Sequence, residues 1–294
     1  MGLMINNNSM ALNATNNLSR NYGNLQTSTQ RLSSGLRINS AADDAAGLAI
    51  RELMRADIAS LNQGVRNAND AISLIQTADG ALGIIDEKLI RMKDLAEQAA
   101  TGTYDSVQRL MIESEYQAMA SEITRIANAT DFNGIHLLNG NLSSETHNGS
   151  QLTSTGKLKV HFGSGNDCAE DYYYVQIGNS TASALGVGMA AGGDGASVST
   201  QQAAQKALEA INNAIVSKDK IRANLGAMQN RLENTISNLN IQAENLQAAE
   251  SRISDVDVAT EMTTFVRNQI LTQSAVAMLS QANSVPRLAL QLMG

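Results

Sequence analysis

The sequence predicts a mainly α-helical protein: an elongated antiparallel helical rod or coiled coil, with a small β-hairpin region and terminal helices that pair on assembly. Apolar residues recur at spacings of three and four near both ends of the 294-residue chain. Aromatic residues make up only 3% of it, and Trp is absent. Seams between long helices are filled by aliphatic side chains, whereas compact cores usually contain more aromatics. The stripes therefore favour helices that pack lengthwise, and assembly rather than catalysis.

The first segment, residues 1–36, predicts a terminal helix that is weak when isolated. It has no acidic residue, and Asn, Ser and Thr fill many positions between the apolar ones. These residues are mediocre helix formers, so the helix should form only when its apolar seam is covered. The predicted stripe on this segment consists of Leu18, Tyr22, Leu25, Thr29, Leu32 and Leu36, and its seam candidates are Leu18, Tyr22, Leu25 and Leu32.

A second weak amphipathic helix is expected at the other end, in residues 255–294. Its seam candidates are Met262, Phe265, Val266, Ile270 and Leu279. A narrow apolar stripe needs a partner helix along its length. We therefore expect the two ends of the chain to pair with each other or to pack on neighbouring copies.

Residues 37–177 predict the N-terminal part of a rod. Ser40 and Asp43 have the spacing of an N-cap and a reciprocal acid, which predicts a helix start there. The apolar rhythm then continues to about Ala100, and Thr101–Tyr104 indicates a turn. A second, antiparallel helix should follow, because the connection is short. Its predicted apolar face consists of Ile112, Tyr116, Met119, Ile123 and Ile126.

Alternating apolar residues at Leu158, Val160 and Phe162, followed by Tyr172–Ile177, predict a β-hairpin. Residues 178–200 are rich in Gly, Ala, Ser and Thr, which predicts a short, flexible, exposed connector. Helical rhythm returns in residues 201–254. Three long antiparallel stripes can then bury one another within one chain.

Composition excludes several partners. The formal net charge is −7 and the isoelectric point is about 5.0, with no basic cluster, so we expect no nucleic-acid binding. No stretch is long and apolar enough for membrane insertion. The segment Met1–Met10 has neither a basic nor an apolar signal region, so an ordinary secretory signal is not expected. The single Cys168 excludes an intrachain disulfide framework.

No pattern predicts a catalytic, cofactor-binding or metal-binding residue, so we expect no enzyme. The three histidines lie in the turn-rich middle without a ligand-like partner four residues away. The string Gly186–Ala191 has the glycine spacing of a dinucleotide fingerprint but not the strand and helix that the fingerprint requires. The acidic residues 167, 170 and 171 are too few for a calcium loop.

Several strings resemble the signatures of bacterial flagellins. At the N-terminal side these are Arg31–Ser40 (RLSSGLRINS), Asp43–Gly47 (DDAAG), Arg66–Asp70 (RNAND) and Phe132–Gly134 (FNG). At the C-terminal side they are Ser251–Ala259 (SRISDVDVA) and Gln281–Pro286 (QANSVP). The resemblance covers about residues 3–140 and 200–292.

The resemblance implies a secreted, extracellular subunit that polymerises with itself into the helical filament of a bacterial flagellum, the propeller for swimming. It also implies export by the flagellar type III apparatus, a cytoplasmic export chaperone, and contacts with filament cap and junction proteins. The two terminal segments would pair in the inner tube of the filament. Only about 60 residues separate the matching halves, so the hairpin and a short loop would replace the large outer domains of many relatives.

The resemblance further suggests contacts with the flagellin-sensing Toll-like receptor. The matching positions are Leu89, Arg91, Leu95 and Glu115, whereas Ile90 and Glu97 depart from the usual Gln and Val. The alternative is that Leu89 and Leu95 serve only packing.

Two further functions stay open at this point. A hook-filament junction protein shares the logic of paired ends but occurs in few copies. A receptor ligand or adhesin would act mainly through its surface. Quantifying the protein in sheared filaments separates the first from a flagellin, which must be the bulk component.

Overall fold

The computed structural model describes residues 8–149, 155–168 and 170–293, and these divide into two units. The terminal unit combines the two ends of the chain, up to Ile58 and from Glu244 onward. The central unit spans Ala59–Ala243. Helices α2 (Ala45–Ala100) and α5 (Gln201–Ser254) each contribute to both units. The segment boundaries expected at residues 36–37 and 254–255 fall where one long helix has ended and the next has not begun.

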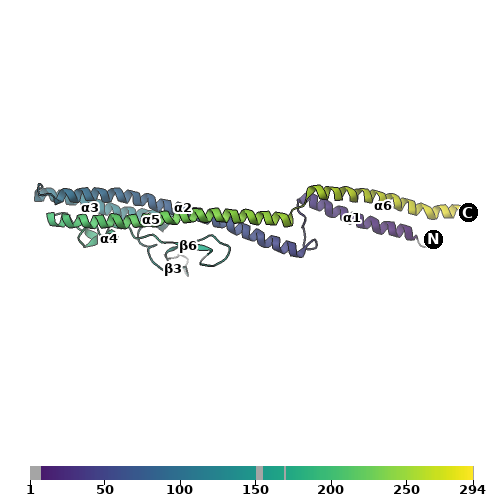
Figure 1. Cartoon of the computed structure of the whole chain (residues 1–294), viewed down its shortest axis with the longest axis horizontal. Helices are drawn as coiled ribbons and strands as arrows, with labels where there is room; N and C mark the ends of the chain where they lie inside the picture. Colours follow the sequence, from purple (N-terminus) through teal and green to yellow (C-terminus); the bar gives the residue numbers. More distant parts are fainter. Residues whose placement is uncertain (1–7, 150–154, 169, 294) are drawn as a thin grey trace. The chain divides into compact units, whose positions relative to one another are not determined.

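Helices dominate the described residues (Figure 1), which confirms the predicted fold class. The other long helices are α1 (Ser9–Ser34), α3 (Ser106–Ala129) and α6 (Val258–Met293). Among the described residues between α3 and α5 are three two-stranded antiparallel sheets and two short helical turns. The strands are β1 (Asp131–Phe132), β2 (Ile135–His136), β3 (His147–Asn148), β4 (Thr155–Gly156), β5 (Leu158–His161) and β6 (Tyr172–Val175). The helical turns are α4 (Ala182–Leu185) and η1 (Met189–Ala191).

Helix α2 begins later than the sequence predicts. The Ser40 hydroxyl does donate to Asp43 Oδ2 at 3.0 Å, but the helix starts at Ala45. The cap is Asp44, whose Oδ1 accepts from the amide of Gly47 at 2.9 Å. Such a side chain satisfies an amide that has no partner within the helix. The Ser40–Asp43 pair therefore forms the turn before the helix, and its hydrogen bonds lower the pKa of the Asp43 carboxyl.

The core of the central unit lies where α2, α3 and α5 run side by side (Figure 1). The predicted face of α3 is confirmed: Ile112, Tyr116, Ile123 and Ile126 are buried, and Met119 packs against them while partly buried. Alanines recur among the buried residues of all three helices. Small side chains let long helices approach closely, which explains how the chain forms a core with few aromatics.

The predicted hairpin forms from β5 and β6, and it packs against α2 at a glycine. Lys159 pairs with Tyr174 and His161 with Tyr172. A Cβ atom on Gly64 would lie 2.0 Å from the carbonyl oxygen of Phe162, so only glycine allows this approach. One turn later, Asn67 Nδ2 donates to the carbonyl of His161 at 2.8 Å.

The segment 178–200 is not an exposed connector, contrary to expectation. Ser180, Val187 and Val198 are fully buried, and Leu185 is nearly so. Helix α3 supplies polar partners for its backbone: the Tyr116 hydroxyl donates to the Gly195 carbonyl at 2.8 Å, and Glu113 accepts from the Val198 amide. Buried backbone groups need such partners. Composition alone hides them, because the partners are about 80 residues away in the sequence.

One lysine is buried in this helical core. The Lys218 side chain on α5 is 2% exposed, and its Nζ pairs with Asp86 of α2 and with Asp219 at 2.7 Å. One turn later, Arg222 Nε donates to Asp79 Oδ1 at 2.7 Å, which lowers the pKa of the Asp79 carboxyl. The Lys218–Asp86 and Arg222–Asp79 pairs join α5 to α2.

We expect the carbon stem of Lys218 to contribute more stability than its charge. The Asp86 side chain is 28% exposed, so water can solvate it when the ammonium is removed. Lys218→Met should therefore lower the free energy of unfolding by about 1 kcal/mol, and Lys218→Ala by about 2–3 kcal/mol, because alanine leaves a cavity. Urea denaturation measures both. Equal losses in the two variants would show that the ion pairs dominate.

Candidate assembly surface

Helices α1 and α6 lie side by side as an antiparallel pair within the terminal unit (Figure 1). At one end, Asn8 Nδ2 donates to the carbonyl of Ala282 at 2.8 Å. At the other end, Arg31 Nη1 lies 3.8 Å from Glu261 Oε2. The two ends of the chain therefore pair with each other, which is the first of the two arrangements expected from the sequence.

The contact face of this pair is filled mainly by small and polar side chains. Its buried members are Ser28 on α1 and Asn268, Thr272, Ala275 and Ala282 on α6. Their spacings of four, three and seven on α6 follow a heptad seam. Five predicted seam residues are partly buried: Leu18, Leu25, Leu32, Phe265 and Leu279. Because most of the buried side chains are small or polar, the pair buries little apolar surface. Polar groups also weaken such a seam.

The stripe of α1 differs from the predicted one at alternate positions. Tyr22 is 57% exposed and Thr29 is exposed, whereas Asn21 is partly buried and Ser28 is buried. Between Leu18 and Leu25, a step of three followed by four reaches Asn21, and a step of four followed by three reaches Tyr22. Hydrophobicity favoured Tyr22, but the antiparallel packing places Asn21 and Ser28 in line with the leucines.

Four predicted seam residues are left exposed in the single chain. Tyr22, Met262, Val266 and Ile270 are 57%, 45%, 44% and 56% exposed, respectively. Six more large apolar side chains on the two helices are also exposed: Met10, Leu12, Val258, Leu271, Val276 and Met278. A groove that includes Leu18, Tyr22, Leu25 and Thr29 follows α1. Clusters of exposed apolar side chains typically mark interaction sites.

Charge is nearly absent from the same helices. The 26 residues of α1 contain two arginines, Arg20 and Arg31, and no acidic residue. Within Val258–Ser284 of α6 the charged residues are Glu261 and Arg267. Arg31 and Glu261 pair with each other. Since charged residues are depleted at the centres of protein interfaces, this surface has the composition of one.

The turns at the base of the pair are held by backbone hydrogen bonds. The Arg37 amide donates to Ser254 at 2.6 Å, and the Val256 amide donates to Gly35 at 3.0 Å. The Arg37 guanidinium donates to the carbonyl of Ile253 at 2.7 Å. Gly35 ends α1 with a φ of +72°, which favours glycine. These bonds hold the residues that follow α1 beside the residues at the end of α5.

The four candidate receptor residues do not form one accessible surface. Leu89 and Leu95 are 0% and 1% exposed and belong to the core of the central unit, which corrects the expectation that both offer contacts. Arg91 and Glu115 are exposed and bind each other, with Arg91 Nη2 2.6 Å from Glu115 Oε1. The structure therefore favours the packing alternative for the two leucines.

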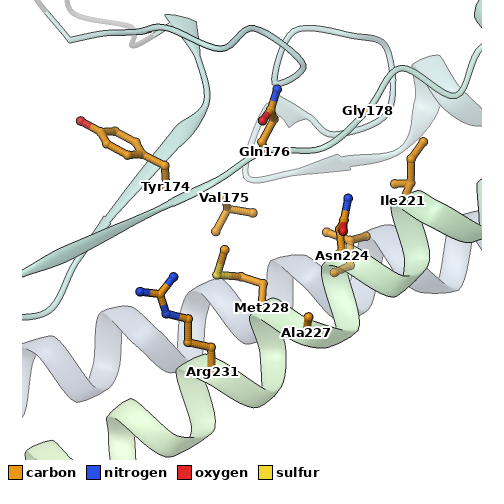
Figure 2. A pocket seen from close by; sticks show the side chains of 10 residues that line it. Tyr174, Val175, Gln176, Gly178, Ile221, Asn224, Ala227, Met228 and Arg231 are labelled. Atoms are coloured by element: carbon orange, nitrogen blue, oxygen red, sulfur yellow. The ribbon is translucent and has the colours of Figure 1, made fainter. Parts of the chain in front are cut away.

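The described part of the central unit contains a cavity beside the β5–β6 hairpin. This cavity of about 560 Å³ lies between β6 and α5 (Figure 2), and no acid, histidine, cysteine or hydroxyl nucleophile other than the Tyr174 phenol lines it. No group of three or more potential metal ligands occurs among these residues. Asp171 organises its own loop by accepting from the Gly165 and Asp167 amides. No described helix is long and apolar enough to span a membrane.

Comparison with known proteins identifies the family. Residues 5–143 match the bacterial flagellin N-terminal helical region, and residues 208–293 match the bacterial flagellin C-terminal helical region. The chain is 41% identical to the flagellar filament 33 kDa core protein of Treponema phagedenis and 43% identical to the flagellin of Halalkalibacterium halodurans; both alignments cover 99% of this chain and all of the relative. The crystal structure of Bacillus cereus flagellin is similar over 63% of this chain and 94% of its own, with 28% identity and a TM-score of 0.47. The chain therefore belongs to the bacterial flagellins, the structural subunits of the flagellar filament.

Proposed function

We propose that copies of this chain polymerise by burying the exposed apolar surfaces of α1 and α6 against neighbouring copies, in the inner part of a helical filament. The proposal rests on one observation: the predicted seam residues divide into a set that lies between α1 and α6 and a set that is exposed. Leu18, Leu25, Leu32, Phe265 and Leu279 line the pair within one subunit, and Tyr22, Met262, Val266 and Ile270 point away from it. The first set orients the two helices, and the second set is the surface between subunits.

The free energy gained by burying this surface is of the same order as the cost of association. Ten large apolar side chains of α1 and α6 are at least 44% exposed. Burying the exposed half of each contributes about 1 kcal/mol, or about 10 kcal/mol in all. Association costs about 4–15 kcal/mol in lost translational and rotational freedom. The whole set must therefore act together, and the loss of a few contacts should prevent assembly.

The same features suit export before assembly. A terminal helix rich in Asn, Ser and Thr, with a polar seam, is weakly stable alone, so the ends can remain unfolded until a partner covers them. We infer export by the flagellar type III apparatus and an export chaperone that covers the apolar surface of α6 in the cell. Filament cap and junction proteins would contact the same helices, and the filament would act as a rotating propeller.

A Toll-like receptor is proposed as a host partner through Arg91 and Glu115. Both side chains are accessible, at 52% and 43% exposed. Leu89 and Leu95 would act indirectly by fixing α2 against the core. An Arg91→Ala variant should then weaken receptor signalling without changing thermal stability, because exposed ion pairs contribute little to folding.

A charge on the proposed interface tests assembly directly. We expect Ile270→Asp to abolish polymerisation of purified subunits, because a carboxylate would have to be buried without a partner. Met189→Asp is the matched control, since Met189 is 75% exposed but lies in the central unit. Sedimentation and electron microscopy measure polymer, and circular dichroism checks the fold.

Equal polymerisation by Ile270→Asp and Met189→Asp would contradict the proposed interface. Loss of polymer in both variants would also contradict it, because the effect would then not be specific to α6.

A further inference from the structure

Each of the three tyrosines of β6 holds a cation against its ring. Lys159 Nζ lies 3.6 Å from the centre of the Tyr172 ring, and Lys157 Nζ lies 5.5 Å from that of Tyr174. On the other face of the strand, Arg231 Cζ lies 3.6 Å from the Tyr173 ring. These separations fall within the range of cation–π attraction. Cation–π attraction therefore favours a position of each cation beside its ring.

These cations lack ion pairs within the described ranges 8–149, 155–168 and 170–293. The chain has 28 acidic residues and 21 lysines and arginines, and many of its other cations do pair with a carboxylate. Lys159 Nζ reaches only the amide oxygen of Asn166, at 3.4 Å. The two lysines thus remain available to a ligand anion, although the net charge of the chain is −7.

Strand pairing gathers two of the cations with two imidazoles on one face. Directly paired residues share a face, so Lys159, Tyr174, His161 and Tyr172 lie together. The His147 ring lies 5.5 Å from that of Tyr174, and the His161 ring lies 5.9 Å from that of Tyr172. Figure 2 shows the Tyr174 side chain pointing away from α5 while Val175 points toward it. We call Lys157, Lys159, His147, His161, Tyr172 and Tyr174 the tyrosine–lysine face.

Three acidic residues, Asp167, Glu170 and Asp171, lie in the loop between β5 and β6. Asp171 precedes Tyr172, and its carboxylate accepts from the amides of Gly165 and Asp167 at 3.2 and 2.7 Å. That carboxylate is consequently directed into the loop. The opposite side of the hairpin is buried through Val160 and Val175.

We propose that the tyrosine–lysine face binds an acidic polysaccharide. The carboxylate or sulfate groups of such a polymer would form charge-assisted hydrogen bonds with Lys157 and Lys159. The apolar faces of its sugar rings would pack against the exposed parts of Tyr172 and Tyr174. A four-residue strand is about 13 Å long, so a face of this length can contact an extended chain rather than only a single ion. The inference rests on the proposed function only in placing the hairpin outside the cell.

The charge pattern favours a polysaccharide over a nucleic acid. Protein surfaces that bind duplex DNA typically neutralise about 6–10 phosphates, and this face offers two lysines and two histidines. The net negative charge of the whole chain would repel a dense polyanion. A polymer with one acidic group per sugar or fewer matches the small number of cations.

The test uses soluble, full-length subunits and three immobilised polymers: polygalacturonate, dextran sulfate and neutral dextran. We expect wild-type protein to bind polygalacturonate, which has one carboxylate per sugar, more tightly than the more densely charged dextran sulfate, and not to bind neutral dextran. The double variant Lys157→Gln/Lys159→Gln should bind roughly tenfold more weakly. The control Lys93→Gln/Lys206→Gln, which removes the same charge from α2 and α5, should bind like wild type. Circular dichroism verifies that all variants are folded.

Four outcomes would overturn the inference: no preference for the acidic polymers over neutral dextran, equal weakening in the control, no weakening in the test variant, or tighter binding of a single-stranded oligonucleotide. Polymerisation of the same variants is measured separately and should be unchanged. A failure of polysaccharide binding therefore leaves the proposed interface of α1 and α6 standing, and a failure of that interface leaves this test valid.

Discussion

Removal of residues 1–36 is expected to leave a folded, soluble subunit that no longer forms filaments. The core of the central unit is built from residues between Ala68 and Leu232, so the deletion removes none of it. It does remove α1, its groove and the partner of α6. Melting monitored by circular dichroism should show a cooperative transition close to that of the full chain, and electron microscopy should show no filaments.

The boundary of this deletion can be checked with a longer one. Residues 37–44 carry contacts of the turn, including Arg37 to Ile253 and Ser40 to Asp43. Removing residues 1–44 should therefore lower the melting temperature as well as prevent assembly. Filaments of normal length from the shorter deletion would refute the role assigned to α1.

Two glycine substitutions in α2 should have opposite effects on stability. Gly80 has no atom within 4 Å of the position of a Cβ, so Gly80→Ala should raise the free energy of unfolding by about 1 kcal/mol through helix propensity alone. At Gly64 the same methyl group meets the Phe162 carbonyl at 2.0 Å. Gly64→Ala should lower the free energy of unfolding by about 1–3 kcal/mol, because overpacking exceeds the gain in propensity.

Urea denaturation of the two variants gives the comparison. The hairpin should also detach in Gly64→Ala, so the amides of Val160 and Val175 should exchange with solvent faster than in wild type. Stabilisation of similar size in both variants would show that the hairpin does not need the glycine, and would contradict the close packing of Phe162 on α2.

The regular parts of the fold could be predicted because their signals are local. The end of α2 at Ala100, the start of α5 at Gln201 and the pairing of the β5–β6 hairpin all follow from periodicity and turn residues. The start of α2 was misplaced because Ser40–Asp43 and Asp44–Gly47 have the same three-residue spacing, and both form hydrogen bonds. Only the second lies at a helix end.

The assembly surface could be predicted only in part. Leu25 follows Leu18 by seven residues, which can be a step of three and then four through Asn21, or of four and then three through Tyr22. The sequence therefore could not show that Asn21 rather than Tyr22 faces α6. The sequence alone also could not predict that segment 178–200 is buried, because its partners on α3 are distant along the chain. The close approach at Gly64 could not be predicted either, because Gly80 and Gly83 interrupt the same helical pattern and have no atom within 4 Å of a Cβ position.

The division of the seam into a surface within the subunit and a surface between subunits is the central claim. A cryo-electron microscopy map of filaments assembled from this chain tests it most directly. The account predicts that Tyr22, Val266 and Ile270 lie against apolar side chains of other copies, within about 4 Å, while Leu25 and Ala275 remain between α1 and α6 of one copy. A map in which Tyr22, Val266 and Ile270 face solvent would contradict it.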